Sequence, residues 1–311
     1  MFFFETSKEN LQISELEINY LLKCKSKLIL DNIFSVTKTK LNENFFSRLA
    51  YTKKIFKVLE QKKSLDKIDF SKHIKNTYKL EIKNYLDEEI NTKEILAKIH
   101  HQISNPKVDI TFPNNIYYLF LYGTKCYLTQ LIFVNEDKPS SRRSHLRKYN
   151  YPTSLNPKQA KFMINLGSKK SFLDPFCGAG GILLEGYLMN LKVKGSDISK
   201  KMIVCAKENL NEFNTKNNLK VQDALTLNKK QEAIITDLPF GKNSHISKEI
   251  DELYSEFFKV AEKLTKTLVI GHLDNADIKK LIKNTKWKIK ESVSIYVHKS
   301  MTRKITLLQN L

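Results

Sequence analysis

The pattern of apolar and polar positions changes near residue 150 of the 311-residue chain. Before that point, apolar runs of strand length are mixed with helical patterns in no regular order, which is typical of α+β folds. After it, strands and helices alternate regularly, and this alternation predicts a parallel, doubly wound sheet. The two halves are therefore expected to differ in architecture.

In the first half, short apolar runs predict strands, and helical spacing predicts helices. The predicted strands are residues 2–5, 27–30, 33–38, 108–112, 116–123 and 126–134, with Pro113-Asn114-Asn115 as a turn. A first helix is predicted to start at Ser14-Glu15-Leu16-Glu17, which has the pattern of a capping box. Further helices are predicted around residues 53–61 and 91–103.

In the second half, Asn156 is the predicted N-cap of a helix over residues 157–167. The predicted strands are residues 171–174, 191–197, 219–223, 232–237, 267–272, 287–298 and 301–309. A further helix is predicted after the glycine-rich turn that follows residue 174, and others are predicted over residues 199–213, 249–264 and 274–284. The last two strands are joined by a tight turn at Lys299-Ser300. Such a turn is too short for a crossover, so these strands are expected to be antiparallel.

Length and composition favour a cytosolic protein of two or three domains. No apolar run approaches the 18 residues that a membrane span needs, and Glu5 interrupts the apolar start where a signal peptide would continue. The cysteines are Cys24, Cys126, Cys177 and Cys205. They show no metal-ligand spacing and are interpreted as reduced thiols, so no metal is expected. We also expect a monomer.

The formal net charge is +20, with excesses of +9 up to residue 150 and +11 beyond it. A solvated, lysine-rich surface explains such a charge as well as a polyanionic partner does. Only five of the 53 basic residues are arginines, and three of these, Arg142, Arg143 and Arg147, fall within residues 140–149. Because arginine grips phosphate bidentately, we predict that this cluster, with His145 and Lys148, binds RNA.

Four predicted strands in succession end in an aspartate. These residues are Asp174, Asp197, Asp223 and Asp237. In open α/β sheets, ligands bind at the carboxyl ends of the strands where the chain reverses direction across the sheet. One acid at such a place is a common turn residue, but four in succession favour a shared ligand site.

Asp174 opens the glycine-rich stretch DPFCGAGG. Gly178 and Gly180 leave room for a ligand near the backbone, and the following helix offers free N–H groups. A dinucleotide fingerprint would need a third glycine where this chain has Leu183, and it has no use for the acid. A cofactor with a positive centre suits Asp174 better. Cys177, in the same loop, is interpreted as a small filler of the cofactor site rather than a nucleophile.

The next two acids suggest a nucleoside site. Asp197 is placed to bind the two hydroxyls of a ribose, and Asp223 to accept a hydrogen bond from an exocyclic amino group. Their neighbours Ile198 and Ala224 are further candidates for cofactor binding. Adenosine with a charged tail describes S-adenosylmethionine, which is the predicted cofactor.

The fourth acid begins Asp237-Leu238-Pro239-Phe240, which fits either an ordinary turn or a pocket for a flat base. An exocyclic amine is a poor nucleophile because its lone pair is conjugated with the ring. Asp237 and the carbonyl of Leu238 would each accept one N–H, which favours the pyramidal nitrogen, while Phe240 stacks on an extruded base. With Pro239 between them, we predict that these are the catalytic residues.

These motifs resemble the catalytic domain of the archaeal tRNA guanosine-10 N2-methyltransferases, which are THUMP-containing RNA methyltransferases. The similar stretches cover most of residues 142–245: RRSHLRKYNYPTSLNPKQAKFMINL, LDPFCGAGGILLEG, GSDISKKM, ENL, QDA and TDLPFGK. The resemblance implies an α/β, Rossmann-like class I methyltransferase with a seven-stranded sheet whose last strand pair is antiparallel. It also implies methyl transfer to N2 of a guanosine in tRNA.

By the same resemblance, Asp174, Gly178 and Gly180 line the methionine side of the cofactor, Asp197 the ribose and Asp223 the adenine. Thr153 matches a position near the methionine end. The first half is similar in arrangement to a ferredoxin-like segment over residues 1–50 and a THUMP RNA-binding domain over 51–137. A basic linker over 138–150 and the methyltransferase domain over 151–311 complete the expected organisation.

The chain departs from the family motif Asp-Pro-Pro-Tyr at Leu238 and Phe240. Leucine keeps the backbone carbonyl and phenylalanine keeps the stacking face, so the departure leaves open whether one methyl group or two are added. Three other functions stay open. They are N2-methylation of another guanosine in tRNA or rRNA, amino-methylation of adenine or of DNA, and an RNA-binding scaffold without activity.

Overall fold

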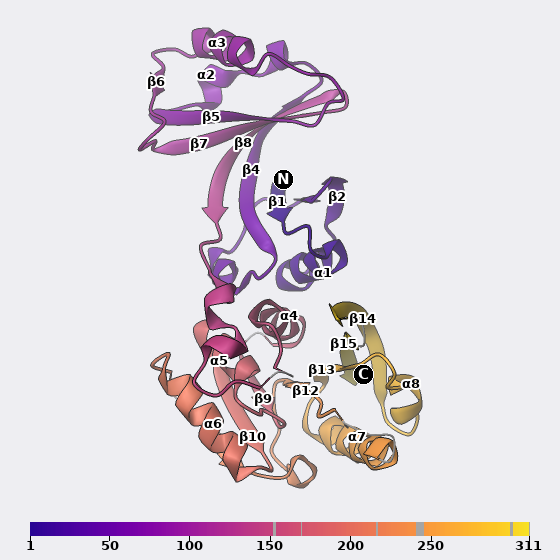
Figure 1. Ribbon diagram of the computed structural model, residues 1–311. Helices are drawn as coiled ribbons and strands as arrows, with labels where there is room; N and C mark the ends of the chain where they lie inside the picture. The colour runs from indigo at the N-terminus through magenta and orange to yellow at the C-terminus, as the bar shows by residue number, and fades with distance from the viewer. Residues whose placement is uncertain (152–153, 169, 216, 241–245, 299–300, 311) are drawn as a thin grey trace. The chain divides into compact units, whose positions relative to one another are not determined.

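The computed structural model describes residues 1–311 except 152–153, 169, 216, 241–245, 299–300 and 311 (Figure 1). The chain forms two compact units. The first comprises Met1–Phe46 and Tyr51–Glu136, and the second comprises Ser47–Ala50 and Asp137–Leu311.

The first unit is built on an eight-stranded sheet with the order β2-β3-β1-β4-β8-β7-β5-β6. Its strands are β1 (Phe2–Thr6), β2 (Lys27–Leu30), β3 (Ile33–Val36), β4 (Thr52–Lys62), β5 (Thr77–Asn84), β6 (Lys107–Val108), β7 (Asn115–Tyr122) and β8 (Lys125–Val134), and its helices are α1 (Leu11–Leu22), α2 (Phe70–His73) and α3 (Thr92–Gln102). In Figure 1, α2 and α3 lie together beside β5 and β7. In the core of this unit, the ring of Phe120 on β7 meets those of Phe3 on β1 and Phe56 on β4 edge to face.

Residues 53–61, predicted to be helical, form strand β4, and the prediction is wrong. Ile55 and Phe56 are fully buried. β4 pairs antiparallel with β1 on one side and with β8 on the other. The apolar residues of this stretch fit a helix and a strand about equally, so the two neighbouring strands decide the outcome.

Helix α1 begins at Leu11 and is capped by Asn10, whose Oδ1 accepts a hydrogen bond from the N–H of Ile13 at 3.0 Å. The predicted start at Ser14 is therefore wrong. Glu17 is buried within the helix and accepts a hydrogen bond from the N–H of Tyr51 at 3.0 Å.

The predicted strand over 108–112 is reduced to the two-residue β6, which pairs parallel with β5. Strand β5 itself was not predicted, and no hairpin joins β6 to β7. The strands predicted at 2–5, 27–30, 116–123 and 126–134 and the helix predicted at 91–103 are confirmed.

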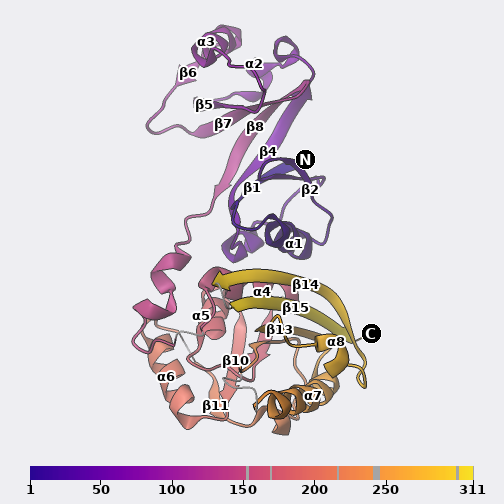
Figure 2. The same ribbon diagram turned by 45° about the vertical axis from the view of Figure 1, so that its right-hand side comes forward.

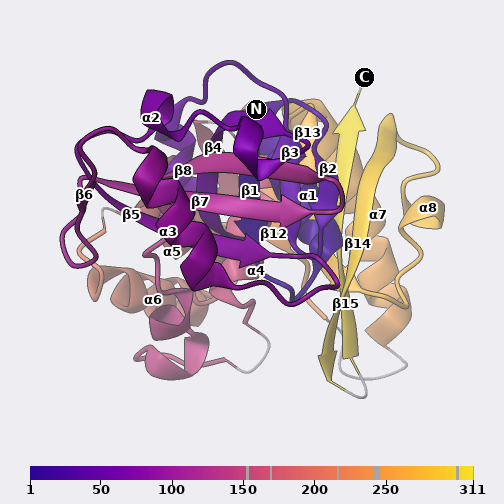
Figure 3. The ribbon, with the colours of Figure 1, turned by 90° about the horizontal axis from the view of Figure 1, so that it is seen from above.

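The second unit is built on a seven-stranded sheet with the order β11-β10-β9-β12-β13-β15-β14. Its strands are β9 (Ser171–Asp174), β10 (Lys192–Asp197), β11 (Leu219–Val221), β12 (Ile234–Asp237), β13 (Thr267–Leu273), β14 (Trp287–His298) and β15 (Met301–Asn310), and its helices are α4 (Pro157–Gly167), α5 (Gly181–Leu188), α6 (Lys200–Asn211), α7 (Ile246–Leu264) and α8 (Ile278–Leu281). Strand β15 runs antiparallel to both β13 and β14, as Figure 3 shows for the latter pair. This confirms the predicted parallel sheet with an antiparallel final pair, whereas the last helix is shorter than predicted.

Helices cover both faces of this sheet. Gly167, at the end of α4, packs so closely against Ile235 and Val269 that a Cβ atom would lie 2.7 Å from the Val269 side chain. Ile234 and Leu268 directly precede Ile235 and Val269 on the same two strands, and they belong to the core cluster that also contains residues of α7. Because side chains alternate across a strand, α4 and α7 cover opposite faces. Figure 2 shows α7 next to α8.

The strand order reverses between β9 and β12. From β9 the chain proceeds outward through β10 to β11, and then returns to β12 on the other side of β9. A crevice is expected at the carboxyl ends of strands around such a point. None of the described helices is long and apolar enough to cross a membrane.

Candidate functional site

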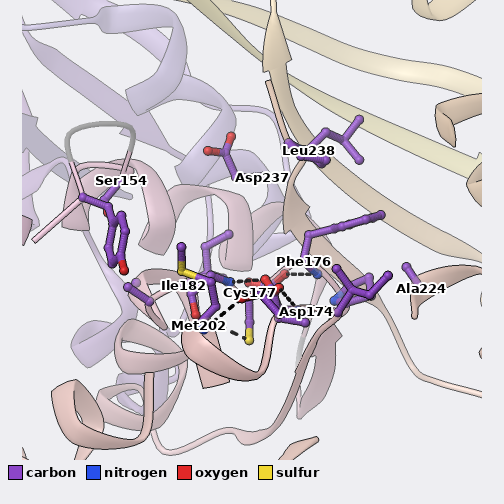
Figure 4. Close-up of a pocket in the computed structure, with 18 of the residues that line it drawn as sticks. Ser154, Asp174, Phe176, Cys177, Ile182, Met202, Ala224, Asp237 and Leu238 are labelled. Atoms are coloured by element: carbon purple, nitrogen blue, oxygen red, sulfur yellow. Dashed lines mark hydrogen bonds between the residues drawn. The ribbon is translucent and has the colours of Figure 1, made fainter. Parts of the chain in front are cut away.

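A cavity of about 580 Å³ lies at the carboxyl ends of β9, β10 and β12. Figure 4 shows Asp174, Asp237, Cys177 and Met202 around it. Its lining comprises Tyr151, Ser154, Leu155, Asp174, Pro175, Phe176, Cys177, Gly178, Ala179, Gly181, Ile182, Asp197, Ile198, Ser199, Met202, Asp223, Ala224, Asp237, Leu238, Pro239, Phe240 and Leu253. The structure thus brings the four strand-end acids together at one cavity.

Asp174 ends β9 and is almost completely buried. Its Oδ1 accepts hydrogen bonds from Thr236 Oγ1 at 2.6 Å and from the N–H of Phe176 at 3.2 Å. Burial, together with the charges of Asp237 and Asp197, raises the pKa of Asp174 to about 8. A positively charged ligand would relieve this concentration of acids.

The glycine-rich loop between β9 and α5 uses its glycines for different reasons. Gly178 has a φ of +50° and nothing within 4 Å of the position of a Cβ atom, so its backbone is open to a ligand. Gly180 has a φ of +85°, and a Cβ atom there would lie 3.3 Å from Ala206 of α6. Gly180 is not among the described residues that line the cavity. The prediction that it makes room for a ligand is therefore corrected: it allows the turn and the close packing of α6.

Cys177 is a small, buried residue of the cavity wall. Burial raises the pKa of its thiol, and the neighbouring Asp174 and Asp197 raise it further. Because the thiolate is the nucleophilic form, this environment disfavours nucleophilic chemistry at Cys177.

Asp197 ends β10, and its carboxylate accepts two backbone hydrogen bonds. The N–H of Gly178 reaches Oδ2 and the N–H of Ser199 reaches Oδ1, both at 2.9 Å. These bonds fix the carboxylate in the cavity lining, where each oxygen keeps a second lone pair for a ligand. Ile198, beside it, is 70% exposed and forms part of the same wall.

Asp223 lies two residues after the end of β11 and caps the short 3₁₀ helix Ala224–Thr226. Its Oδ1 accepts the N–H of Leu225 at 2.9 Å. Ala224 is buried and lines the cavity with it. Thr153 lies outside the described residues, whereas its neighbour Ser154 lines the cavity.

Asp237 ends β12, between β9 and β13. Its Oδ2 lies 3.2 Å from Nη2 of Arg303 on β15, and its Oδ1 has no hydrogen-bond partner among the described residues. Burial raises the pKa of Asp237 to about 7, although the charge of Arg303 opposes this. A Cβ atom on Gly271 would lie 2.2 Å from Oδ1, so only glycine at position 271 leaves room for this carboxylate.

The residues after Asp237 are held by the surrounding fold. The N–H of Leu238 donates to the carbonyl of Gly271 at 2.9 Å, and the side chain of Leu238 is buried. Tyr254 on α7 donates its hydroxyl to the carbonyl of Pro239 at 2.7 Å. The ring of Phe240 lies under the Arg303 guanidinium, with 5.0 Å from Cζ to the ring centroid.

Two of the three clustered arginines do not fit the predicted role in RNA binding. Arg142 is buried and forms ion pairs with Asp137 at 2.6 Å and with Glu185, whose side chain is fully buried, at 2.8 Å. Arg147 is also buried, and its Nε donates to the carbonyl of Arg142 at 2.9 Å. Arg142 ties the segment to α5 and Arg147 is bonded within the segment, so the prediction for these two residues is corrected.

The other members of the cluster remain accessible. Arg143 and His145 are exposed. Lys148 is exposed as well and pairs with Glu208 at 2.7 Å. A phosphate contact from this segment therefore depends on Arg143 and His145, with Lys148 available if it leaves Glu208.

Sequence reasoning missed Arg303, Gly271 and Tyr254, which shape the surroundings of Asp237 from β15, β13 and α7. The rarity of arginine was one available signal, because Arg303 is one of only five in the chain. Among the described residues, no group of three or more His, Cys, Asp or Glu side chains is placed to hold a metal ion.

Comparisons with known proteins agree with this arrangement. The family model described as RMKL-like, methyltransferase domain, matches residues 144–305. The chain is 31% identical over 285 residues to the tRNA (guanine(10)-N2)-dimethyltransferase of Methanothermobacter thermautotrophicus, a match that covers 85% of this chain and 84% of that protein. It is 34% identical over 179 residues to the protein of the same name from Pyrococcus abyssi, covering 55% and 54% of the two chains.

Among solved structures, TrmN from Thermus thermophilus aligns with a TM-score of 0.51 and 16% sequence identity. The alignment covers 100% of this chain and 99% of that one. At this level of identity, the likeness concerns the fold alone.

Proposed function

The chain belongs to the RMKL-like methyltransferases, and from this premise we propose that it methylates the exocyclic N2 of a guanosine in tRNA with S-adenosylmethionine as donor. Its second unit has the class I methyltransferase fold that the sequence predicted. The relatives named for guanine 10 support that nucleotide as the target. Their names also support the addition of two methyl groups, with the singly methylated base as the first product.

The observation that carries the proposal is the surroundings of Asp237. This carboxylate lines the cavity beside Leu238, Pro239 and Phe240, and its Oδ1 lacks a hydrogen-bond partner among the described residues. An unsatisfied acceptor at a buried position is costly unless a ligand supplies the donor. An exocyclic amine supplies such a donor.

The cavity suits S-adenosylmethionine on three counts. Its acids, of which Asp174 carries a pKa raised to about 8, favour a ligand with positive charge. Gly178 leaves the backbone open to close approach. Asp197 and Asp223 are fixed at neighbouring strand ends, where they would hold the ribose and the adenine, while Asp174 and Gly178 would hold the methionine part. When bound, this cofactor supplies an electrophilic methyl group with a neutral thioether as leaving group.

The residues of the chain then position and activate the amine. Asp237 accepts one N–H of the guanine N2 amine and the carbonyl of Leu238 accepts the other, which draws the nitrogen lone pair out of conjugation with the ring. As the N–C bond forms, the amine must lose a proton, and the carboxylate of Asp237 is the acceptor for it. With a pKa raised to about 7, Asp237 is half ionised near neutral pH, which suits a group that takes up and releases a proton.

Two further residues organise the base. Phe240 offers its ring face to the extruded guanine, and stacking of this kind replaces the contacts that the base loses when it leaves its helix. Tyr254 holds the carbonyl of Pro239 and so fixes the backbone between the acid and the ring.

The remaining parts of the chain are proposed to recognise the tRNA. We assign residues 1–50 to a ferredoxin-like segment, 51–137 to a THUMP domain, 138–150 to a basic linker and 151–311 to the methyltransferase domain. Arg143 and His145 are exposed linker side chains that can meet phosphates, and Lys148 can do so if it leaves Glu208. The protein is proposed to act as a monomer in the cytosol.

Mass spectrometry of nucleosides tests the proposal. The full chain is incubated with S-adenosylmethionine and an unmodified tRNA transcript, and the modified nucleotide is mapped. We expect N2-methylguanosine followed by N2,N2-dimethylguanosine at position 10, and neither in a transcript with adenosine at that position. Methylated adenosine, or labelling of duplex DNA instead of tRNA, would overturn the assignment of the substrate.

A further inference from the structure

Arg303 contacts two residues of the Asp237–Phe240 stretch from behind the cavity wall. Its side chain is buried, with 4% of its surface exposed. Nη2 lies 3.2 Å from Asp237 Oδ2, and the guanidinium lies over the ring of Phe240 at 5.0 Å. Arg303 is not among the described residues that line the cavity, and these two neighbours connect it to the site of a bound base.

The antiparallel direction of β15 explains why the arginine arrives at this place. Arg303 pairs in register with Leu273, the last residue of β13. Asp237 pairs with Gly271 two residues earlier on the same strand. The start of β15 therefore lies beside the carboxyl end of β13 and one strand away from that of β12, where the parallel strands present the site.

The titratable and charged groups of this part of the site come from five elements of the second unit. They are Asp174 at the end of β9, Asp197 at the end of β10, Tyr254 on α7, His272 on β13, and Arg303 and Lys304 on β15. Burial lowers the pKa of His272 to about 4, so its imidazole is neutral. Burial opposes ionisation of Asp237, and the charge of Arg303 favours it.

We infer that Arg303 is a positioning residue for the proposed methyl transfer: it keeps the Asp237 carboxylate ionised and in place, and it supports the Phe240 ring on which the target base stacks. Arginine suits both tasks at once. Its guanidinium donates from its edge to a carboxylate while its flat face lies on an aromatic ring, which the ammonium of lysine cannot do. The role in catalysis rests on the proposed function, whereas the effect on Asp237 can be measured without it.

The test compares Arg303→Met and Arg303→Lys with Lys304→Met, which removes a charge from the next residue of the same strand. The ¹³C carboxyl resonance of Asp237, identified by its loss in Asp237→Asn, is titrated by NMR in the full chain. In Arg303→Met we expect the midpoint to rise by about one pH unit or more, since an opposite charge at this distance lowers the pKa of a carboxyl by about that amount. Arg303→Lys and Lys304→Met should keep it near the value of the unmodified chain.

Turnover against pH gives the second readout. At pH 7, Arg303→Met should lose activity about fivefold or more, because that upward shift leaves a smaller fraction of Asp237 ionised, and the loss should disappear towards pH 9. Arg303→Lys should retain the pH profile but raise the KM for tRNA, because the flat support under Phe240 is missing. Lys304→Met should behave as the unmodified chain.

An unchanged midpoint in Arg303→Met, together with a loss of activity equal at every pH, would overturn the inference and leave Arg303 a purely structural residue. If Arg303→Met does not fold, Arg303→Gln gives the same comparison. If the unmodified chain methylates no guanosine, the proposed function fails, yet the NMR titration still decides whether Arg303 controls Asp237.

Discussion

Charged residues cluster both at the strand ends of the second sheet and in the basic segment 138–150. The two clusters differ in whether their charges are neutralised by other residues of the fold. At the strand ends, Asp174, Asp197 and Asp237 face one cavity, and two of them carry raised pKa values. In the basic segment, Arg142 is neutralised inside the fold by Asp137 and Glu185. Acids that gather at a cavity in excess of the cations paired with them indicate a ligand, whereas arginines matched by buried acids indicate structure.

The two cases differ because the topology of the sheet fixes the position of the acids in advance. The carboxyl ends of parallel strands lie along one edge of the sheet, so residues at these ends come close together regardless of the rest of the sequence. No such rule places the arginines of an irregular segment. A count of basic residues therefore says little about which of them reach the surface.

Removal of the acid at position 237 should produce the largest effect. Asp237→Ala is expected to lower kcat by on the order of 10³-fold, because both the hydrogen-bond acceptor and the proton acceptor are lost. Affinity for S-adenosylmethionine, measured by calorimetry, should hardly change. Glu256→Gln, an exposed change on α7, is the control. A large loss of cofactor affinity in Asp237→Ala would show that this carboxylate belongs to the cofactor site instead.

Removal of the buried arginine should affect stability instead of chemistry. Arg142→Ala leaves Glu185 buried without its partner, and breaking such a pair costs about 3–5 kcal/mol of unfolding free energy. Urea denaturation followed by circular dichroism measures the loss. Arg143→Ala, its exposed neighbour, should change stability by less than about 0.5 kcal/mol. Equal stability of the two variants would refute the structural role of Arg142.

Gly271→Ala tests how closely the site around Asp237 is fitted. The added Cβ atom would lie 2.2 Å from Asp237 Oδ1, so the carboxylate must move. A displacement of about 1 Å typically lowers turnover by about 10²-fold. Steady-state kinetics with tRNA should show this loss, while the cofactor still binds. Full activity would mean that the carboxylate can work from a second position.

The pH dependence of stability tests the raised pKa of Asp174. In the folded chain this carboxyl keeps its proton up to about pH 8, whereas in the unfolded chain it loses its proton near pH 4. Its contribution to stability is therefore full below pH 4 and is lost as the pH rises towards 8. Relative to Asp174→Asn, the unmodified chain should lose up to about 1.4 kcal/mol of unfolding free energy per pH unit in this window. A difference independent of pH would show that Asp174 is ionised throughout.

The smallest effect is expected from Arg143→Ala on tRNA binding. Loss of one phosphate contact should weaken the affinity and reduce the slope of log K against log salt by about one unit. Filter binding at several salt concentrations gives this slope. Lys148→Ala serves for comparison, because Lys148 already pairs with Glu208. An unchanged slope in Arg143→Ala would remove the segment from the RNA interface.

The sequence predicted correctly those features of the fold that depend on local hydrophobic periodicity or on the length of a connecting loop. The strands that carry Asp174, Asp197 and Asp237 and the antiparallel end of the sheet were predicted because each depends on local pattern or loop length. The prediction failed at residues 53–61, where the apolar positions fit both a helix and a strand and the neighbouring strands decide the outcome. Long-range pairing of this kind is not encoded in a short window.

The contributions of Gly271 and Arg303 could not be predicted for a related reason. Gly271 lies 34 residues after Asp237 and Arg303 lies 66 residues after it, and only strand register brings them to the carboxylate. The rarity of arginine was visible in the sequence, but the partner of each arginine could not be predicted from it. At two of the five arginines, Arg142 and Arg303, the guanidinium pairs with a carboxylate of the same chain inside the fold.

The position of β15 has a consequence for how the second unit folds. This strand follows β14 in the chain but is inserted between β13 and β14. Strand β14 borders on β15 and not on β13, so the sheet reaches its full width only when β15 is paired with β13. Without β15, β13 would expose an apolar edge. The same pairing brings Arg303 to Asp237, so the site around this carboxylate is complete only when the sheet is complete.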